Sequence, residues 1–307
     1  MKVERPCSNT AVAGARRLAG IFLVWVFMLV CGCERVGEIP TDPEQLEAAR
    51  FKAVKWEGQR RTHALIEAGA KINARDHGGW TPLHYAINRM RDGKFRDMGT
   101  IRSLIVEAGA DVNAVSNEGF APVSLAAEVG AIECLDLLLE NGADVNFHDD
   151  VGMNLLMLAV NSRQTEMAEH LIKRGADVNE LMPRGGGALY IAVQRRSPDA
   201  VRLLIEHGSE IGGSEKLEAP IIAAASLRNE EVVKLLLAAG ADVNAVNQAT
   251  GITALHRAVA SGSPSIISLL LAAGANVNAL NAAAATPRAL AEQMGDPEVI
   301  SLLSAGS

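Results

Sequence analysis

Histidine and cysteine are two of the residue types in this sequence that could bind a metal or act as a base or nucleophile. The chain has seven histidines and four cysteines. No pair of histidines has the HExxH spacing of a zinc enzyme, and no histidine stands beside a pair of cysteines. Three cysteines fall within the first 33 residues, and Cys134 lies alone in an apolar segment, where we expect a buried, unreactive thiol. We therefore predict no catalytic residue, no metal site, no cofactor and no disulfide framework.

Carboxylates and glycines are numerous, but their positions follow a repeat. The glycine run at 185–187 has neither a preceding strand nor a following Lys-Ser/Thr, so it does not fit a phosphate-binding loop. One aspartate position recurs with the repeat, and this recurrence favours a structural role over a catalytic one. This position is occupied by Asp111, Asp144, Asp177 and Asp242.

Two short strings recur in step along the chain. The first reads Gly-Ala-Asp-Val-Asn, and its glycines, variants included, are 40, 33, 33, 33, 32 and 34 residues apart. The second is similar to Thr-Pro-Leu-His-x-Ala. The strings begin at Gly69, Gly109, Gly142, Gly175, Gly208, Gly240 and Gly274, and at Thr81, Ala121, Asn154, Gly187, Ala219, Thr253 and Thr286. A fixed period of this length indicates an array of small units.

Each period has the residues expected of two helices and a loop. The threonine that opens the second string, as at Thr81, can cap a first helix, and the proline that follows suits the first helical turn. A second apolar stretch follows about ten residues later and gives a helix with one buried stripe. The glycine of the first string then ends this helix, because a left-handed residue there suits glycine. We predict stacked helix-turn-helix units that are stable only against their neighbours.

The period and both strings resemble ankyrin repeats over about residues 44–305. The resemblance implies an all-α ankyrin-repeat solenoid, in which stacked helix-turn-helix units carry projecting β-hairpin-like loops. We expect an ankyrin repeat domain at 43–307, with an N-terminal capping unit at 43–74, six inner repeats at 75–279 and a C-terminal capping repeat at 280–307. The resemblance also implies that His84 and His256 bridge the backbone of adjacent repeats.

Two departures from the period predict local differences. The 40-residue spacing places an insertion at 89–97, between the helices of the first full repeat. Farther on, the glycines at 185–187 replace a capping threonine, and Gly212 and Gly213 shorten the next loop. Because glycine weakens local structure, we expect amide exchange to open residues 181–218 before their neighbours.

The N-terminus has the layout of a secretion signal. Residues 1–19 carry four basic side chains and one acidic side chain, and residues 20–33 carry no charge. The segment ends Leu-Val-Cys-Gly-Cys33, which resembles the lipobox of bacterial lipoproteins and implies a lipid on Cys33. We expect a signal peptide at 1–32 and a lipidated N-terminus and tether at 33–42; the alternative is an uncleaved anchor helix. Either form attaches the array to a membrane of the bacterial envelope, facing the periplasm or the cell surface.

The predicted partner is another protein. A formal net charge of −7 offers no basic footprint for nucleic acid. The resemblance to ankyrin repeats implies a concave face of loops and first helices that receives a protein. We expect large apolar side chains at the loop tips to form a recognition stripe there; the alternative is that they fold back on their own loops. The stripe consists of Trp80, Phe120, Met153 and Ile252, rimmed by Arg75, Glu118, Asp149 and Asp150.

Further candidate contacts lie on the same predicted elements. His77 and His148 are on loops, where we expect them to be solvated, with partner contact as the alternative. The first helices add variable polar positions. These are Asn88, Arg89, Glu128, Asn161, Gln194 and Arg195.

Two classes of function fit these features. The first is a non-catalytic binding protein of the envelope that holds or inhibits a partner, for example as an immunity protein against an envelope-targeted toxin. The second is an accessory or docking subunit of an envelope enzyme that acts on oxidants or cell-wall material. An enzyme in its own right is the least favoured class.

Overall fold

The structure is a computed structural model that describes residues 64, 67–69, 71–92, 97–213 and 217–305. The predicted signal peptide, the lipid site at Cys33, the tether and most of the N-terminal capping unit lie outside the described residues. Among the described residues, no helix is long and apolar enough to cross a membrane.

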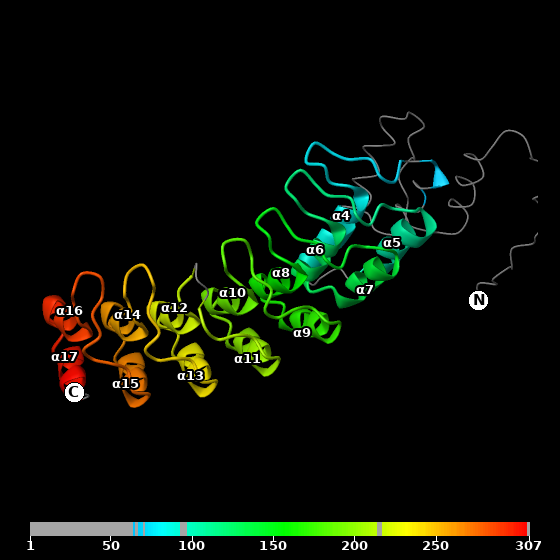
Figure 1. Cartoon of the computed structure of the whole chain (residues 1–307). Coiled ribbons are helices and arrows are strands. Elements are labelled where there is room, and N and C mark those ends of the chain that lie inside the picture. The colour runs from blue at the N-terminus through cyan, green and yellow to red at the C-terminus, as the bar shows by residue number, and fades with distance from the viewer. Residues whose placement is uncertain (1–63, 65–66, 70, 93–96, 214–216, 306–307) are drawn as a thin grey trace, which may run out of the picture.

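Helices in the described chain alternate between two rows, with a loop projecting from each unit on one side (Figure 1). The first row contains α4 (Pro82–Asn88), α6 (Pro122–Val129), α8 (Leu155–Asn161), α10 (Ala188–Gln194), α12 (Pro220–Ser226), α14 (Ala254–Ala260) and α16 (Pro287–Met294). The second row contains α5 (Met98–Arg102) with its π-helical continuation η3 (Ser103–Glu107), α7 (Ile132–Glu140), α9 (Thr165–Lys173), α11 (Pro198–Glu206), α13 (Glu230–Ala238), α15 (Pro264–Ala272) and α17 (Pro297–Ala305). The predicted all-α solenoid is confirmed.

The loops are hairpin-like, as predicted. Isolated antiparallel bridges close three of them, and they join His148 to Asn154, Leu181 to Gly187, and Val246 to Thr253. Each of these three hairpins ends where the next first helix begins, so the loop is fixed to the start of that helix.

Local chemistry sets the ends of the helices. The Thr286 hydroxyl accepts from the backbone N–H of Ala289 at 3.1 Å and caps α16. Pro287 takes the first helical position, where a missing N–H costs nothing. At the other end, Gly142 follows α7 with a φ of 87°, a left-handed conformation that glycine adopts without steric cost.

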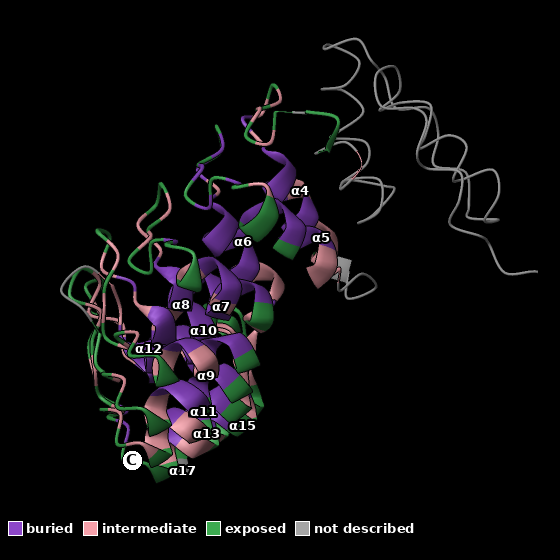
Figure 2. Cartoon of the chain, turned by 90° about the vertical axis from the view of Figure 1, so that its right-hand side faces the viewer, coloured by how far each residue is buried: buried purple, intermediate pink, exposed green. Residues whose placement is uncertain are grey.

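The core lies where helices of the two rows and of neighbouring repeats meet (Figure 2). Small residues of the first helices, such as Ala126 and Ala127, are fully buried and let neighbouring helices approach closely. Cys134 on α7 is also fully buried, and burial raises the pKa of its thiol to about 12. The prediction of a buried cysteine is confirmed, and the raised pKa supports the prediction that its thiol is unreactive.

A row of asparagines ties neighbouring repeats together. The side chain of Asn113 donates to the carbonyl of Gly142 at 2.8 Å and accepts from the backbone N–H of Asp144 at 3.0 Å. The same pair of hydrogen bonds joins Asn73, Asn179 and Asn244 to the following repeat. Gly212 stands at the equivalent position of the fifth full repeat and has no side chain to form this bridge.

The predicted insertion lies between α4 and α5. A 3-10 turn, η2 (Arg89–Asp92), follows α4, and α5 begins only at Met98. In the next repeat α6 ends at Val129 and α7 begins at Ile132. The extra residues therefore lengthen one connection and leave the stacking of α4 on α6 in place.

Candidate protein-binding surface

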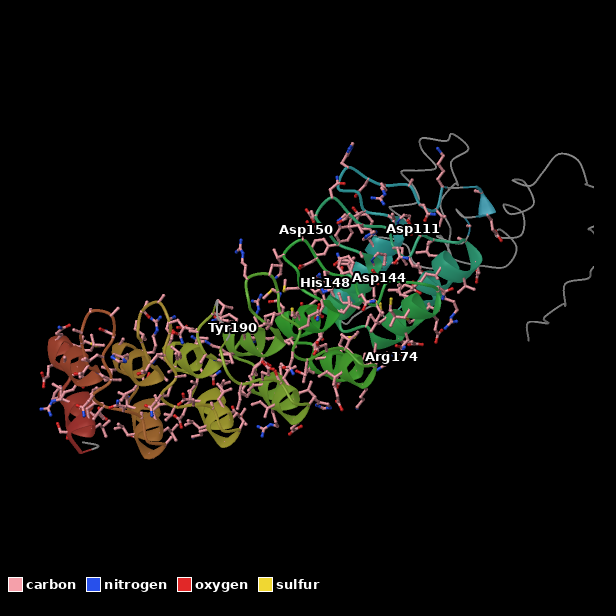
Figure 3. All side chains as sticks on the ribbon, viewed as in Figure 1. Asp111, Asp144, His148, Asp150, Arg174 and Tyr190 are labelled. Atoms are coloured by element: carbon pink, nitrogen blue, oxygen red, sulfur yellow. The ribbon has the colours of Figure 1, made fainter. Side chains whose placement is uncertain are left out.

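The predicted contact residues come from the hairpin loops and the first helices. Figure 3 shows His148 and Asp150 on the hairpin side of the array and Arg174 on the side of the second helices. Glu118 and Asp150 are exposed on their hairpins, and Gln194 and Arg195 are exposed at the end of α10. The fold therefore places the predicted contact residues, unlike Arg174, along the side of the hairpins and first helices.

The expected stripe of large apolar residues is not at the loop tips. Each of its members lies at the foot of its hairpin, because its carbonyl accepts from the backbone N–H that opens the loop, as Trp80 does from Asp76 at 3.0 Å. Each is half-buried and packs against the core, so the prediction of their location is corrected. The four residues are Trp80, Phe120, Met153 and Ile252. Their contact with a partner stays a prediction.

An aromatic cluster fixes the first hairpin. The Trp80 ring lies 5.2 Å from that of Tyr85, 5.7 Å from that of His84 and 6.2 Å from that of Phe120, measured between centroids. The Tyr85 hydroxyl donates to the carboxylate of Asp76, which also accepts from two backbone N–H groups of the loop. Burial raises the pKa of Tyr85 to about 12, and Asp76 adds to this effect. Sequence analysis missed Tyr85 and Asp76, because only the folded loop brings them together.

His84 and His256 bridge adjacent repeats, as the resemblance implied. Nε2 of His84 lies 3.0 Å from the carbonyl oxygen of Phe120, and Nε2 of His256 lies 3.1 Å from that of Ala285. A carbonyl can only accept, so Nε2 carries the proton and Nδ1 accepts from the backbone N–H of Thr81 or Thr253. Burial lowers the pKa of both imidazoles, which favours this neutral form.

His148 joins two hairpins. Its Nε2 lies 2.6 Å from Oε1 of Glu180 in the next loop, and the other oxygen of Glu180 accepts from the Asn154 amide at 2.6 Å. The hydrogen bond to Glu180 raises the pKa of His148. Hydrogen bonds from Asn154 and then His148 lower the pKa of Glu180. His148 is exposed as expected, but it pairs with a neighbouring loop. His77 is exposed on the first hairpin.

The remaining candidates connect neighbouring units. Arg75 donates to the carbonyl of Val115 at 2.6 Å. Glu128 on α6 pairs with Arg91 at 3.0 Å, and Asn161 on α8 accepts from Arg195 at 2.8 Å. Asn88 and Arg89, at the end of α4, are partly exposed. The surface is therefore held by contacts that cross from one repeat to the next.

Sequence analysis missed a row of exposed apolar side chains. Each follows the asparagine position of the first string by two residues, and their exposed fractions range from 42% at Val115 to 61% at Leu280. The repeated register was the signal that could have found them. The row consists of Val115, Leu181, Val246 and Leu280, with His148 at the same position of one hairpin.

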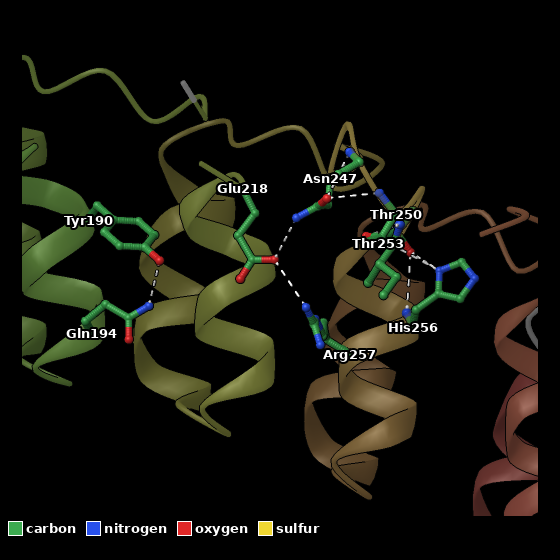
Figure 4. A network of polar contacts seen from close by, with 10 residues as sticks. Tyr190, Gln194, Glu218, Asn247, Thr250, Thr253, His256 and Arg257 are labelled. Atoms are coloured by element: carbon green, nitrogen blue, oxygen red, sulfur yellow. Dashed lines mark hydrogen bonds and ion pairs between the residues drawn. The ribbon is translucent and has the colours of Figure 1, made fainter. Parts of the chain in front are cut away.

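A small cavity lies where the fourth and fifth full repeats meet. It encloses about 100 Å³ and is lined by residues that include Tyr190, Gly213, Leu217 and Glu218. Glu218 accepts from Asn247 at 3.4 Å and pairs with Arg257 at 3.5 Å (Figure 4). Ligand pockets usually enclose about 300–1,000 Å³, so the cavity is too small for such a ligand. Within the described residues, no three His, Cys, Asp or Glu side chains gather as a metal site would require.

Comparisons with known proteins agree with this architecture. A family model of ankyrin repeats (3 copies) matches residues 51–149, 94–182, 123–215, 156–247 and 221–307. The ankyrin repeat protein FPV233 of fowlpox virus is 55% identical over 40 residues, which are 13% of this chain and 8% of the viral protein. The crystal structure of the human ASB11 ankyrin repeat domain is similar with a TM-score of 0.65 and 27% identity, covering 74% of this chain and 98% of that domain. The chain belongs to the ankyrin repeat family, whose fold is a scaffold for protein–protein interaction.

Proposed function

We propose that the protein is a non-catalytic binding protein that holds or inhibits another protein through the face formed by its hairpins and first helices. The observation that carries the proposal is the row of exposed apolar side chains at Val115, Leu181, Val246 and Leu280. Exposed apolar groups in a polar surround are typical of protein-recognition surfaces.

The rigidity of the hairpins supports the same proposal. Asn73, Asn113, Asn179 and Asn244 each fix their loop to the next repeat, and His148 joins two loops through Glu180. A surface that is already ordered loses less conformational entropy when it binds. Little of the free energy of binding is therefore needed to order the array.

We also propose that the array is tethered to a membrane of the bacterial envelope through a lipid on Cys33. The support is the basic segment at 1–19, the uncharged segment at 20–33 and the Gly32–Cys33 pair. A tether would hold the array near its partner and raise the effective concentration. In that setting the partner is an envelope protein, and a toxin directed at the envelope is one candidate.

Site-specific photo-crosslinking in intact cells tests the binding face. A photo-reactive residue replaces Glu118 on a hairpin or, as the matched control, Glu133 on α7; both glutamates are exposed. We expect a discrete adduct from position 118 and none from position 133. Equal adducts from the two positions, or adducts from position 133 alone, would refute the proposed face.

A further inference from the structure

Three consecutive turns carry arginine where the flanking turns carry glycine. The turns join the first helix to the second helix in each repeat and follow one another along the array (Figure 1). Arg163, Arg196 and Arg228 have φ values of 60°, 53° and 56°. The equivalent residues in the flanking repeats are Gly130, Gly262 and Gly295, with φ values of 73°, 60° and 68°.

A left-handed conformation is unfavourable for arginine. Its Cβ approaches the backbone there, whereas glycine has no such contact. Among the described residues only four non-glycine residues have positive φ, and three of them are these arginines. The flanking turns show that the fold accepts glycine at this position, so the turn itself does not require the arginine side chain. Strain retained at repeated positions indicates a role outside the fold.

The side chains are exposed, and two of them are held in place. Arg163 donates to the carbonyl of Arg195 at 2.8 Å, and Arg228 donates to the carbonyl of Gly262 at 3.3 Å. Arg195, beside Arg196, is held by its bond to Asn161 at 2.8 Å. A guanidinium has five N–H donors, so each keeps most of them for a ligand.

These arginines also lack acidic partners. Within the described chain, no carboxylate lies within 4.0 Å of the guanidinium of Arg163, Arg195, Arg196 or Arg228. Five arginines elsewhere on the array do have such partners, whereas Arg75, Arg102 and Arg184 have none among the described residues. The five are Arg91, Arg174, Arg202, Arg257 and Arg288, paired with Glu128, Asp136, Glu231, Glu218 and Glu292.

We propose that Arg163, Arg195, Arg196 and Arg228, here called the arginine row, bind an acidic segment of the partner protein. The inference rests on the proposed protein-binding function and adds the chemistry of the partner. Guanidinium groups bind carboxylates through paired hydrogen bonds. A chain with a net charge of −7 has no general attraction for acidic peptides, so binding must come from a local basic site.

The spacing of the repeats predicts the form of this segment. Packed helices lie about 8–10 Å apart, so successive turns present arginines at similar steps. An extended polyproline-II chain rises about 3.1 Å per residue and presents every third residue on the same side, at steps of about 9 Å. A segment with a carboxylate at every third position therefore fits one acidic residue to each turn.

Peptide binding to the full chain tests the arginine row. The probe is a fluorescent twelve-residue peptide with glutamate at every third position, and its glutamine analogue is the neutral control. At low ionic strength, where screening is weak, we expect the glutamate peptide alone to bind. The combined variant Arg163→Gly, Arg196→Gly and Arg228→Gly should bind about tenfold more weakly or worse. Arg195→Gln, which leaves the turns unchanged, should weaken binding as well.

A control variant removes the same charge elsewhere. Arg102→Gln, Arg184→Gln and Arg202→Gln together change exposed arginines outside the row and should bind the peptide like the unchanged protein. The triple glycine variant should melt at the same temperature or higher, because glycine relieves the left-handed strain. Equal binding by the two triple variants, or a lower melting temperature of the glycine variant, would overturn the proposal.

Nucleic acid is the other polyanion to exclude. Tighter binding of a twelve-nucleotide single-stranded DNA than of the peptide, lost in the glycine variant, would assign the row to phosphates and overturn the proposal. The proposed function is tested independently, by the photo-crosslinked adduct at position 118 in intact cells, and that test does not use the peptide. An adduct at position 118 without binding of the acidic peptide would refute the arginine row alone.

Discussion

At the scale of single residues, hairpin side chains support the fold as well as the surface. Trp80 contacts three other rings, and its neighbour Asp76 is held by Tyr85 and by the loop backbone. The half-buried position of Trp80 means that only part of its ring is available to a partner. A substitution here must therefore be judged first by its effect on stability.

We predict that Trp80→Ala lowers the free energy of unfolding by about 2–3 kcal/mol, because it removes ring contacts and half-buried apolar area. Glu118→Ala on the next hairpin is exposed and should change it by less than about 0.5 kcal/mol. Urea unfolding followed by circular dichroism measures both. If Trp80→Ala left the free energy of unfolding unchanged, the aromatic cluster would not stabilise the hairpin. The Trp80 ring would then be better explained as a group that contacts the partner.

The His148–Glu180 pair gives a pH dependence. The pKa of His148 is raised from 6.5, so its contribution is fully present below pH 6.5 and is lost as pH rises through the folded-state value. The pKa of Glu180 is lowered from 4.5, so its contribution is present above pH 4.5 and is lost as pH falls. The pair should therefore stabilise the hairpins most between pH 4.5 and 6.5.

His148→Gln should destabilise the protein more at pH 5.5 than at pH 8.5. The side chains are 41% and 38% exposed, so the difference should be below about 1 kcal/mol. Urea unfolding of both proteins at the two pH values measures it. A difference of the opposite sign would mean that His148 is not charged in the pair.

At the scale of elements, the link after the fifth full repeat has a glycine at the asparagine position. Gly212 stands where Asn113 and Asn179 each make two bonds to the next repeat. A Cβ built on Gly212 meets nothing within 4 Å, whereas one built on Gly213 lies 2.8 Å from the backbone nitrogen of Ala219. These facts support the expectation that residues 181–218 exchange first, which stays a prediction.

Gly212→Asn should therefore stabilise the array. By equivalence with Asn113 and Asn179, we expect the new side chain to donate to the carbonyl of Gly240 and accept from the backbone N–H of Asp242, and the gain should be about 1 kcal/mol. Amide exchange over 181–218 should slow accordingly, as mass spectrometry can measure. Gly213→Asn is the matched control and should destabilise, because of the close Ala219 nitrogen. Stabilisation by both variants, or by neither, would contradict the prediction that an asparagine at position 212 stabilises the array through bonds to the next repeat.

Much of the fold was predictable because the residues that begin and end the helices recur in most repeats. The glycine that ends α7 and the proline that begins α16 recur in register, so helix ends follow from the sequence. Contacts between repeats were not predictable in the same way. His148 and Glu180 lie 32 residues apart, and the positive φ of Arg163, Arg196 and Arg228 is a backbone conformation that their residue type does not indicate.

The candidate site was predictable to the level of elements and not of side-chain placement. The strings located the hairpins and first helices, and hence Glu118 and Gln194 on the exposed side. They did not show that Trp80 lies at the foot of its hairpin, because a hydrogen bond from Asp76 decides this. The exposed Val115 and its equivalents were overlooked, although their register is present in the sequence.

At the scale of the whole molecule, the proposed tether makes a prediction of its own. Cys33→Ser should release the protein from the membrane fraction and abolish incorporation of a radiolabelled fatty acid, because the thiol is the proposed site of the lipid. Cys31→Ser leaves Gly32–Cys33 intact and should remain lipidated and membrane-bound. Membrane association of the Cys33→Ser protein would instead support the uncleaved anchor helix.

Stacking makes one long surface from short elements. Several hairpins and first helices are fixed to the next repeat by side-chain bonds to backbone, such as those of Asn113 and His84. A partner can therefore contact several repeats at once without ordering them. We propose that the partner covers this surface.

Hydrogen–deuterium exchange of the full chain, with and without the partner captured by crosslinking, tests this claim most directly. We predict slower exchange on binding in the hairpins and first helices, including residues 111–128 and 144–161. The second helices, such as α7, α9 and α11, should exchange as in the free protein. Protection confined to the second helices would show that the partner binds the opposite side of the array and would contradict the account.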